Sequence, residues 1–355
     1  MTEAIRLGLN LGYAGVGLGG DAVALARAAE ECGYAMVWVA EAYGSDAPTV
    51  LSWIGAQTST IGLGSAVMQI PGRSPAMTAM TAATLDMLSG GRMLLGLGVS
   101  GPQVSEGWHG MPFRSPLART REYVGIVRTA LARETVTSPG PHYPLPLPGG
   151  PGKALRLTVR PIQPRIPIYL AAVGPRNLEL VGELADGWHG ILVSPSNAPD
   201  SLDHLRAGRL RAGFGGDGSD PLTGFDTVAS VQAAITDDLD SARARVAAYV
   251  ALYIGGMGSR EQNFYNDLAH RMGFGEAATR IQDLYLEGRA RDAAAAVPVE
   301  FVDEVSLIGP AERVAAGLRR FAGAGITTVA IQPIGLRPDE RARTVRTMAS
   351  LVDSL

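Results

Sequence analysis

Two kinds of feature in this sequence could take part in chemistry: side chains that move a proton, and a turn that holds an anion. Glu41, Tyr43 and His109 are three candidates for proton transfer. The residues Gly-Pro-Arg-Asn at 174–177 follow a short apolar run, and apolar residues then continue at helical spacing. Because proline suits the first turn of a helix, the free N–H groups of that turn, beside Arg176, predict an anion site.

Several other polar residues have side chains suited to the same chemistry. Tyr13, Asp46 and Glu106 are further candidates for moving a proton. Glu41 has two interpretations that the sequence leaves open, a proton-transfer group or a structural carboxylate that binds N–H groups. His189, between a tryptophan and a glycine near the expected start of a strand, is predicted to be packed and structural. No set of His, Asp or Glu side chains has the spacing typical of metal ligands, so we expect no bound metal. The sequence also shows no recognisable Ser-His-Asp catalytic triad.

Strand-like and helix-like segments that could position these residues alternate almost from end to end. Strands that are apolar on both faces and alternate with helices predict a parallel sheet. Eight such units in 355 residues predict a closed (β/α)8 TIM barrel, with its active site at the C-terminal ends of the strands. The predicted strands are 5–11, 35–40, 61–67, 92–98, 167–172, 190–194, 225–235 and 327–333.

We expect a single domain over residues 1–355 with two additions to the barrel. The segment 137–164 is rich in proline and glycine and predicts a long loop. Residues 255–305 carry helical patterns and predict an insertion before the last strand, a natural wall for a substrate pocket.

Composition narrows the function class. The net charge is −3, which gives no basic field for nucleic acid, and the one cysteine, Cys32, excludes an internal disulfide. The uncharged segment 47–72 is punctuated by proline and glycine, so we expect no membrane span. The N-terminus lacks a basic leader pattern. We therefore expect a cytoplasmic protein whose partner is a small-molecule substrate.

A glycine-rich motif offers a rival interpretation. "GVGLGG" (15–20) fits G-x-G-x-x-G, and Glu41 follows about 20 residues later, as in an NAD(P)-dependent Rossmann dehydrogenase. A second match, "GLGVSG" (96–101), runs into Pro102 rather than into a predicted helix. Among 45 glycines such matches arise by chance, so the barrel is favoured.

Longer stretches carry a resemblance to a known family. "GSAVMQIPGRSPAMTAMTAATLDMLSGGRMLLGLGVSG" (64–101), "VWVAEAYGSDA" (37–47) and "AAVGPRNLELVGELADGW" (171–188) resemble the luciferase-like superfamily, specifically its actinobacterial coenzyme F420-dependent oxidoreductases. The resemblance implies a TIM barrel with a deazaflavin, or alternatively FMN, across its mouth. It also implies a homo-oligomer, since relatives are often dimers.

The same resemblance implies which residues hold the cofactor. Its phosphate would lie at the turn 174–177, and a non-prolyl cis peptide between Ala66 and Val67 would form a ridge behind the ring. The implied cofactor-binding residues are Glu41, Ala66, Val67, Gln69, Ser100, Gly101, Ala172, Gly174, Pro175, Arg176 and Asn177.

Two departures from relatives narrow the reaction. Relatives that oxidise alcohols or sugar phosphates often carry Asp-His where this chain has Glu41-Ala42, and methylenetetrahydromethanopterin reductases carry acidic residues at Asn10 and Gly101. Both substrate classes are disfavoured. We expect a reductase that transfers hydride from the deazaflavin C5 to an activated C=C, C=N or C=O bond. The alternatives are an FMN-dependent monooxygenase and a barrel that only binds the cofactor.

Overall fold

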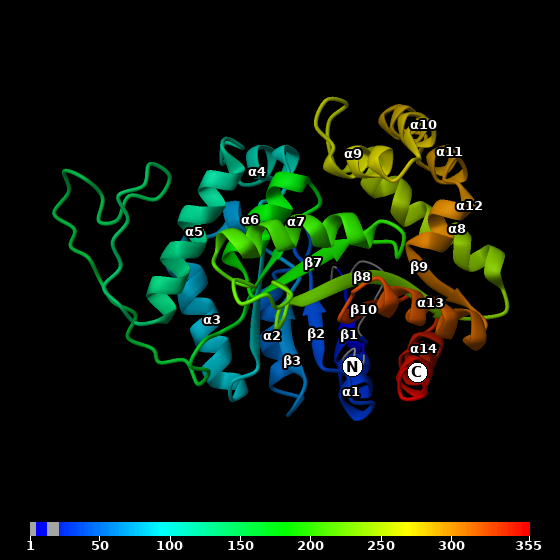
Figure 1. Cartoon of the computed structure of the whole chain (residues 1–355), viewed down its shortest axis with the longest axis horizontal. Helices are drawn as coiled ribbons and strands as arrows, with labels where there is room; N and C mark the ends of the chain where they lie inside the picture. The colour runs from blue at the N-terminus through cyan, green and yellow to red at the C-terminus, as the bar shows by residue number, and fades with distance from the viewer. Residues whose placement is uncertain (1–4, 13–20) are drawn as a thin grey trace.

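The chain forms a closed barrel of parallel strands surrounded by helices, as the computed structural model of residues 5–12 and 21–355 shows (Figure 1). Each strand pairs with the next, and β10 pairs with both β1 and β8, so the sheet closes. The TIM barrel predicted from the alternating pattern is confirmed. Its strands are β1 (Arg6–Asn10), β2 (Met36–Val39), β3 (Gly62–Ser65), β5 (Met93–Gly98), β6 (Ile168–Ala171), β7 (Gly187–Ile191), β8 (Asp226–Ile235) and β10 (Thr328–Pro333).

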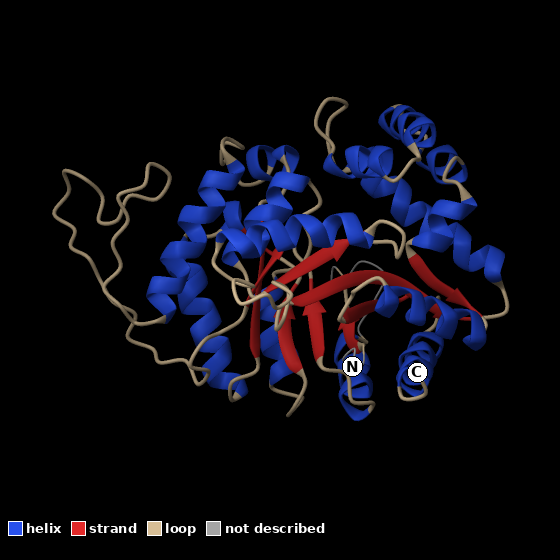
Figure 2. Cartoon of the chain, viewed as in Figure 1, coloured by secondary structure: helices blue, strands red, loops and turns tan. Residues whose placement is uncertain are grey.

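Helices cover the outside of this barrel (Figure 2). Local signals set their ends: Ser74 accepts a hydrogen bond from the Met77 amide at the start of α3, and Gly90, with φ of 71°, closes it in a left-handed conformation. The covering helices are α1 (Ala22–Glu31), α2 (Ala47–Gly55), α3 (Pro75–Ser89), α5 (Pro116–Leu131), α6 (Pro175–Leu184), α7 (Ala198–Arg211), α8 (Leu239–Ala251), α13 (Ala311–Gly323) and α14 (Pro338–Val352).

Side chains fill the barrel below its mouth, so it is a packed core and not a pore. Trp38 and Tyr169 pack edge to face there, with ring centroids 5.0 Å apart. Lower down, Asp226 accepts hydrogen bonds from the Tyr169 hydroxyl (2.9 Å) and from Thr328 (2.8 Å), and it pairs with Arg6 (2.8 Å). This end stabilises the fold and leaves the opposite end for chemistry.

One predicted strand is wrong by three residues. The apolar run at 190–194 suggested a strand, but β7 covers Gly187–Ile191 and the chain leaves the sheet at Leu192. Leu192 has φ of 52°, a left-handed conformation that ends a strand and that an apolar pattern does not reveal. His189 therefore lies inside the strand and not at its start.

The structure adds elements that the pattern did not predict. A short helix, α4 (Pro102–Gly107), begins at the proline that was expected to exclude one. β4 (Met68–Gln69) pairs with the end of β5, and β9 (Ser306–Gly309) pairs with the end of β8. The segment 137–164 runs away from the barrel without helix or strand, apart from a bridge between Ser138 and Leu145 (Figure 1).

The segment before the last strand, predicted as an insertion over residues 255–305, is helical. It begins with a π-helical turn, Leu252–Gly256, at the end of α8 and returns to the sheet at β9. Its helices gather on one side of the barrel mouth (Figure 1). They are α9 (Phe264–Arg271), α10 (Gly275–Leu286), α11 (Ala290–Ala295) and α12 (Val299–Glu304).

Candidate active site

A large cavity opens at the C-terminal ends of the barrel strands. Its volume is about 1040 Å³, which is enough for a cofactor ring system together with a small substrate. All eleven residues for which the resemblance implied cofactor contact line it, and so does Tyr43. His109 is not among its lining residues. The cavity thus brings the predicted site together, with one predicted residue beside it.

The turn after β6 forms one corner of the cavity. Gly174 caps α6 in an extended conformation, and Pro175 is the first helical residue. The N–H groups of Arg176 and Asn177 belong to the first helical turn, where no carbonyl of the helix can accept them. No atom lies within 4 Å of the place where a Cβ on Gly174 would stand, so the approach to these groups is open. Helix dipole, free amides and a cation all favour an anion here.

The insertion is tied to this corner. Arg271, the last residue of α9, donates a hydrogen bond of 2.7 Å to the carbonyl oxygen of Val173, one residue before the cap. Burial lowers the pKa of Arg271, and the negative charge of Asp267 offsets part of that effect. The guanidinium nevertheless stays charged at any physiological pH.

A bulge between β3 and β4 forms another wall. The peptide bond between Ala66 and Val67 is cis, as the resemblance implied. The bulge lies directly on β5: a Cβ on Gly96 would stand 1.7 Å from the Ser65 carbonyl oxygen, and one on Gly98 would stand 2.5 Å from Val67 Cγ2. Only glycine fits at Gly96, because the clash is with backbone. The "GLGVSG" match therefore reflects close packing of the bulge.

Glu41 is held in a network of hydrogen bonds. Its carboxylate binds both terminal nitrogens of Arg73, each at 2.8 Å, and accepts the Ala47 amide at 2.9 Å and the Gln69 amide at 3.2 Å. Its side chain is only 7% exposed. Between the two interpretations that the sequence left open, this geometry favours the structural carboxylate, since its oxygens are already engaged by fixed donors.

The Gln69 side chain joins two parts of the mouth. Its amide nitrogen donates to the Ala42 carbonyl oxygen, and its Oε1 lies 2.8 Å from His109 Nε2. Because Oε1 can only accept, Nε2 of His109 carries the proton. His109 thus orients Gln69 from behind the cavity wall.

The other candidates for proton transfer differ in availability. Asp46 caps α2 through the Thr49 amide and also pairs with Arg73, while Glu106 accepts the Phe113 amide at 2.8 Å. Tyr43 is 60% exposed and lines the cavity. Among the described candidates, Tyr43 is the proton carrier with the freest access to a ligand.

The floor of the cavity contains polar residues, of which Ser230 and Gln232 were not singled out from the sequence. Asn10 donates to the Ser230 hydroxyl, and Gln232 lies beside them on β8. His189, predicted to be packed and structural, is indeed buried against Trp38, with ring centroids 4.9 Å apart, but it also lines the cavity. Burial lowers the pKa of His189 to about 4, and the charge of Asp226 offsets only part of this. Its imidazole is therefore neutral at physiological pH.

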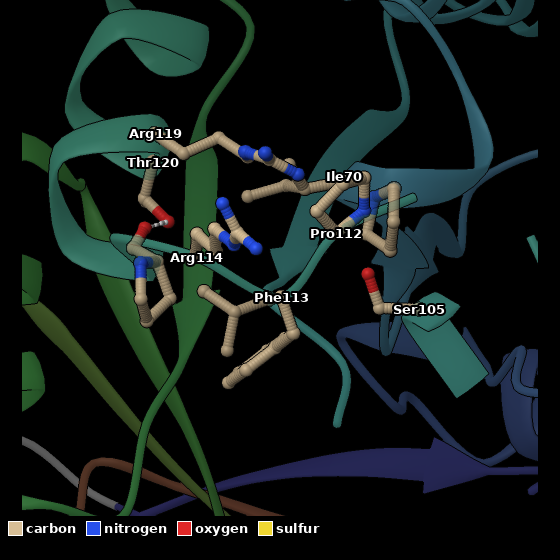
Figure 3. Close-up of a pocket in the computed structure, with 10 residues that line it drawn as sticks. Ile70, Ser105, Pro112, Phe113, Arg114, Arg119 and Thr120 are labelled. Carbon is tan, nitrogen blue, oxygen red and sulfur yellow. Dashed lines mark hydrogen bonds between the residues drawn. The ribbon is translucent and has the colours of Figure 1, made fainter. Parts of the chain in front are cut away.

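A second cavity lies beside the mouth, between the α4–α5 connection and the first turns of α5 (Figure 3). Its volume is only about 10 Å³, close to that of one water molecule. Thr120 there donates to the Pro116 carbonyl oxygen at 2.8 Å, and Arg119 Nε is buried without a partner among the described residues (Figure 3). This cavity is too small for an organic ligand.

Two other properties bear on function. Among residues 5–12 and 21–355, no three His, Cys, Asp or Glu side chains are grouped closely enough to bind a metal ion. Within the same ranges, no helix is long and apolar enough to cross a membrane.

Comparison with known proteins adds independent findings. The sequence model of the luciferase-like monooxygenase family matches residues 12–328. A Mycobacterium tuberculosis protein, provisionally named a coenzyme F420-dependent oxidoreductase, is 43% identical over 99% of this chain and 100% of its own length. A 5,10-methylenetetrahydromethanopterin reductase of Archaeoglobus fulgidus is 29% identical over 89% of this chain and 90% of its own.

A solved structure has a very similar fold. It is the coenzyme F420-dependent tetrahydromethanopterin reductase of Methanopyrus kandleri, which superimposes with a TM-score of 0.82 over 99% of both chains at 23% identity.

Proposed function

The chain belongs to the luciferase-like monooxygenase family, and on that premise we propose that it is a coenzyme F420-dependent oxidoreductase acting as a reductase. The observation that carries this proposal is the single cavity that contains both the anion-binding turn of α6 and the bulge on β3–β4. The 43% identity to a relative named for coenzyme F420 supports the choice of cofactor. We infer that its substrate differs from those of these relatives, because Glu41-Ala42, Asn10 and Gly101 depart from their residue patterns.

The residues present fit a deazaflavin nucleotide. The amides of Arg176 and Asn177 would hold its phosphate, and the Arg176 guanidinium would add a charge-assisted bond. The bulge at Ala66-Val67 would support one face of the ring, and Ser100 and Gly101 would border its edge. When bound, a deazaflavin gives or takes a hydride at one ring carbon.

The chain's own residues supply the remaining requirements of a reduction. The neutral imidazole of His189 puts no positive charge on the floor of the cavity. We propose that the proton that accompanies the hydride comes from Tyr43 or from water, since Glu41 is bound to Arg73. The product is the substrate with one C=C, C=N or C=O bond saturated.

A titration with three cofactors tests this proposal. Purified protein is titrated with coenzyme F420, FMN and NADPH while tryptophan fluorescence is followed, and reduced coenzyme F420 is then mixed anaerobically with a panel of activated acceptors. We expect micromolar binding of coenzyme F420, weaker binding of FMN, and reoxidation by an acceptor. Preference for FMN with stoichiometric oxygen consumption would favour the monooxygenase. Binding without turnover would favour a barrel that only holds the cofactor.

Substitution of Arg176 by Gln is expected to weaken coenzyme F420 binding about tenfold. A hydrogen bond to a charged group contributes about 1.5–3 kcal/mol, and the exposure of Arg176 places it at the lower end of that range. The measurement is the dissociation constant of coenzyme F420 at two salt concentrations. The loss of affinity in the variant should be smaller at the higher salt concentration, because salt screens the charge of Arg176. Arg160→Gln, an exposed arginine of the long loop, is the matched control. Equal affinities in both variants would remove Arg176 from the site.

We further propose that the protein is a homodimer that associates through α2 and α3. Trp53 on α2 is 66% exposed, and Met77, Met80 and Leu88 project from α3 at 51%, 50% and 71% exposure. Large apolar side chains exposed on two helices that pack together favour an interaction site. Light scattering should give twice the chain mass of 37.1 kDa. Met80→Glu should shift the protein to monomer, and Leu155→Glu in the long loop should not; a wild-type monomer would refute the proposal.

We infer a cytoplasmic protein because its single cysteine, Cys32, is free, which suits a reducing compartment.

A further inference from the structure

One face of α8 and its π-helical continuation lines the cavity. Arg245, Tyr249, Leu252 and Tyr253 are the side chains that it contributes. Their spacing of four, three and one residues puts them on the same side of a helix. The chain after β8 therefore presents an arginine and an aromatic surface to the same space as the predicted cofactor site.

Arg245 has no acidic partner among the described residues. It is partly buried, and no carboxylate of residues 5–12 or 21–355 lies within ion-pair distance of it. Its neighbour Arg243, by contrast, binds Asp303 through two nitrogens at 3.0 and 2.6 Å. A guanidinium stays charged at every relevant pH, and a charge turned towards a mostly apolar cavity is stabilised best by a bound anion.

Aromatic rings stand next to this cation. The Tyr249 and Tyr253 ring centroids are 4.7 Å apart, and Tyr265 meets Tyr253 edge to face at 4.8 Å. Phe264 also lines the cavity. Such a surface favours a flat apolar group, which buries area against the rings without having to satisfy buried polar atoms.

Arg245 is separate from the anion-binding turn. Arg176 follows β6, Arg245 follows β8, and β7 lies between these strands in the barrel. A single phosphate bound at the α6 turn therefore leaves the Arg245 guanidinium without an anionic partner of its own. The cavity has room for a second molecule.

We propose that the substrate is a flat, apolar molecule that carries a carboxylate or phosphate, with its anion on Arg245 and its body against Tyr249, Tyr253 and Tyr265. This inference rests on the proposed function, because it assigns the α6 turn to the cofactor. Coenzyme F420 could itself bring a second anion, and the experiment separates the two sources.

The test uses matched acids and amides. The full chain, loaded with coenzyme F420, is titrated calorimetrically with cinnamate, 2-naphthoate, indole-3-acetate and benzoate, each against its neutral amide. We expect at least one acid to bind tenfold or more tightly than its amide. Arg245→Gln should reduce that preference to within twofold, and Arg245→Lys should keep part of it. Arg280→Gln, an exposed arginine on α10, changes the net charge equally and should leave the preference intact.

Four results would overturn the inference. In the wild type, they are equal affinity for acids and amides, or no binding of any acid. In Arg245→Gln, they are a preference for acids that survives, or a loss of coenzyme F420 affinity with no effect on the acids. The last result would assign Arg245 to the cofactor. If the wild type binds no coenzyme F420, the proposed function fails, and the acid–amide comparison on the unloaded protein still decides whether Arg245 binds an anion.

Discussion

Replacement of Glu41 by Ala is expected to lower the free energy of unfolding by about 3 kcal/mol. Removing one partner of a buried ion pair leaves an uncompensated charge and costs about 3–5 kcal/mol. The lower end of this energy range applies because Arg73 still pairs with Asp46 after the substitution. The Ala47 and Gln69 amides also lose their acceptor. Urea denaturation followed by tryptophan fluorescence measures the change.

Two controls make this result specific. Glu31→Ala removes an exposed glutamate of α1 and should change stability by less than about 0.5 kcal/mol. The double variant Glu41→Ala/Arg73→Ala should cost less than the sum of the single changes, because the second substitution removes the stranded charge. If Glu41→Ala instead keeps full stability and coenzyme F420 affinity while turnover disappears, Glu41 is a catalytic residue and the structural interpretation is wrong.

Acidification is expected to remove about 3 kcal/mol of stability through His189 alone. In the folded protein burial lowers the pKa of this imidazole to about 4, against 6.5 in the unfolded chain. Between pH 6.5 and 4 this histidine is protonated in the unfolded chain but not in the folded protein. The contribution of His189 to the free energy of unfolding is therefore complete above pH 6.5 and is lost as the pH falls to 4. A difference of this size corresponds to about 3 kcal/mol at 1.36 kcal/mol per pKa unit.

The slope of stability against pH, and not the absolute stability, identifies this group. His189→Gln should flatten the slope between pH 6.5 and 4, whereas His270→Gln, an exposed histidine of α9, should not. Glu30 acts in a different window: burial raises its pKa, but the amides of Thr60, Ile61 and Ser59 together lower it to about 2. The stability that the Glu30 carboxylate contributes is therefore lost only as the pH falls below 4.5. Identical slopes in the wild type and His189→Gln would show that the imidazole is not buried.

The architecture was predictable because it depends on patterns that a sequence displays. Apolar runs and helix signals marked all eight barrel strands, and parallel strand ends must meet at one face. The shift of β7 came from Leu192, whose left-handed conformation has no sequence signal. The helix at Pro102 was missed although proline at a first helical position is common.

The candidate site was only partly predictable, because function depends on contacts between distant residues. Nothing near Glu41 indicates that Arg73, 32 positions later, would take up its carboxylate. The role of Gly96 depends on a bulge that crosses from another strand. Arg245 was overlooked because arginine is abundant throughout the chain, and only its place on the cavity side of α8 distinguishes it. A helical run of arginine and tyrosine facing a barrel mouth would have been the signal to use.

The way in which the insertion joins the barrel has an evolutionary consequence. It leaves at the end of α8 and returns at β9, which is paired with the last four residues of β8 outside the closed ring of strands. Barrel closure runs through β8 and β10 and does not involve this segment. The segment can therefore be lengthened, shortened or replaced during gene divergence without opening the barrel. The part of the cavity wall that α9 contributes, Phe264 and Tyr265, is thus separable from the barrel that carries the α6 turn.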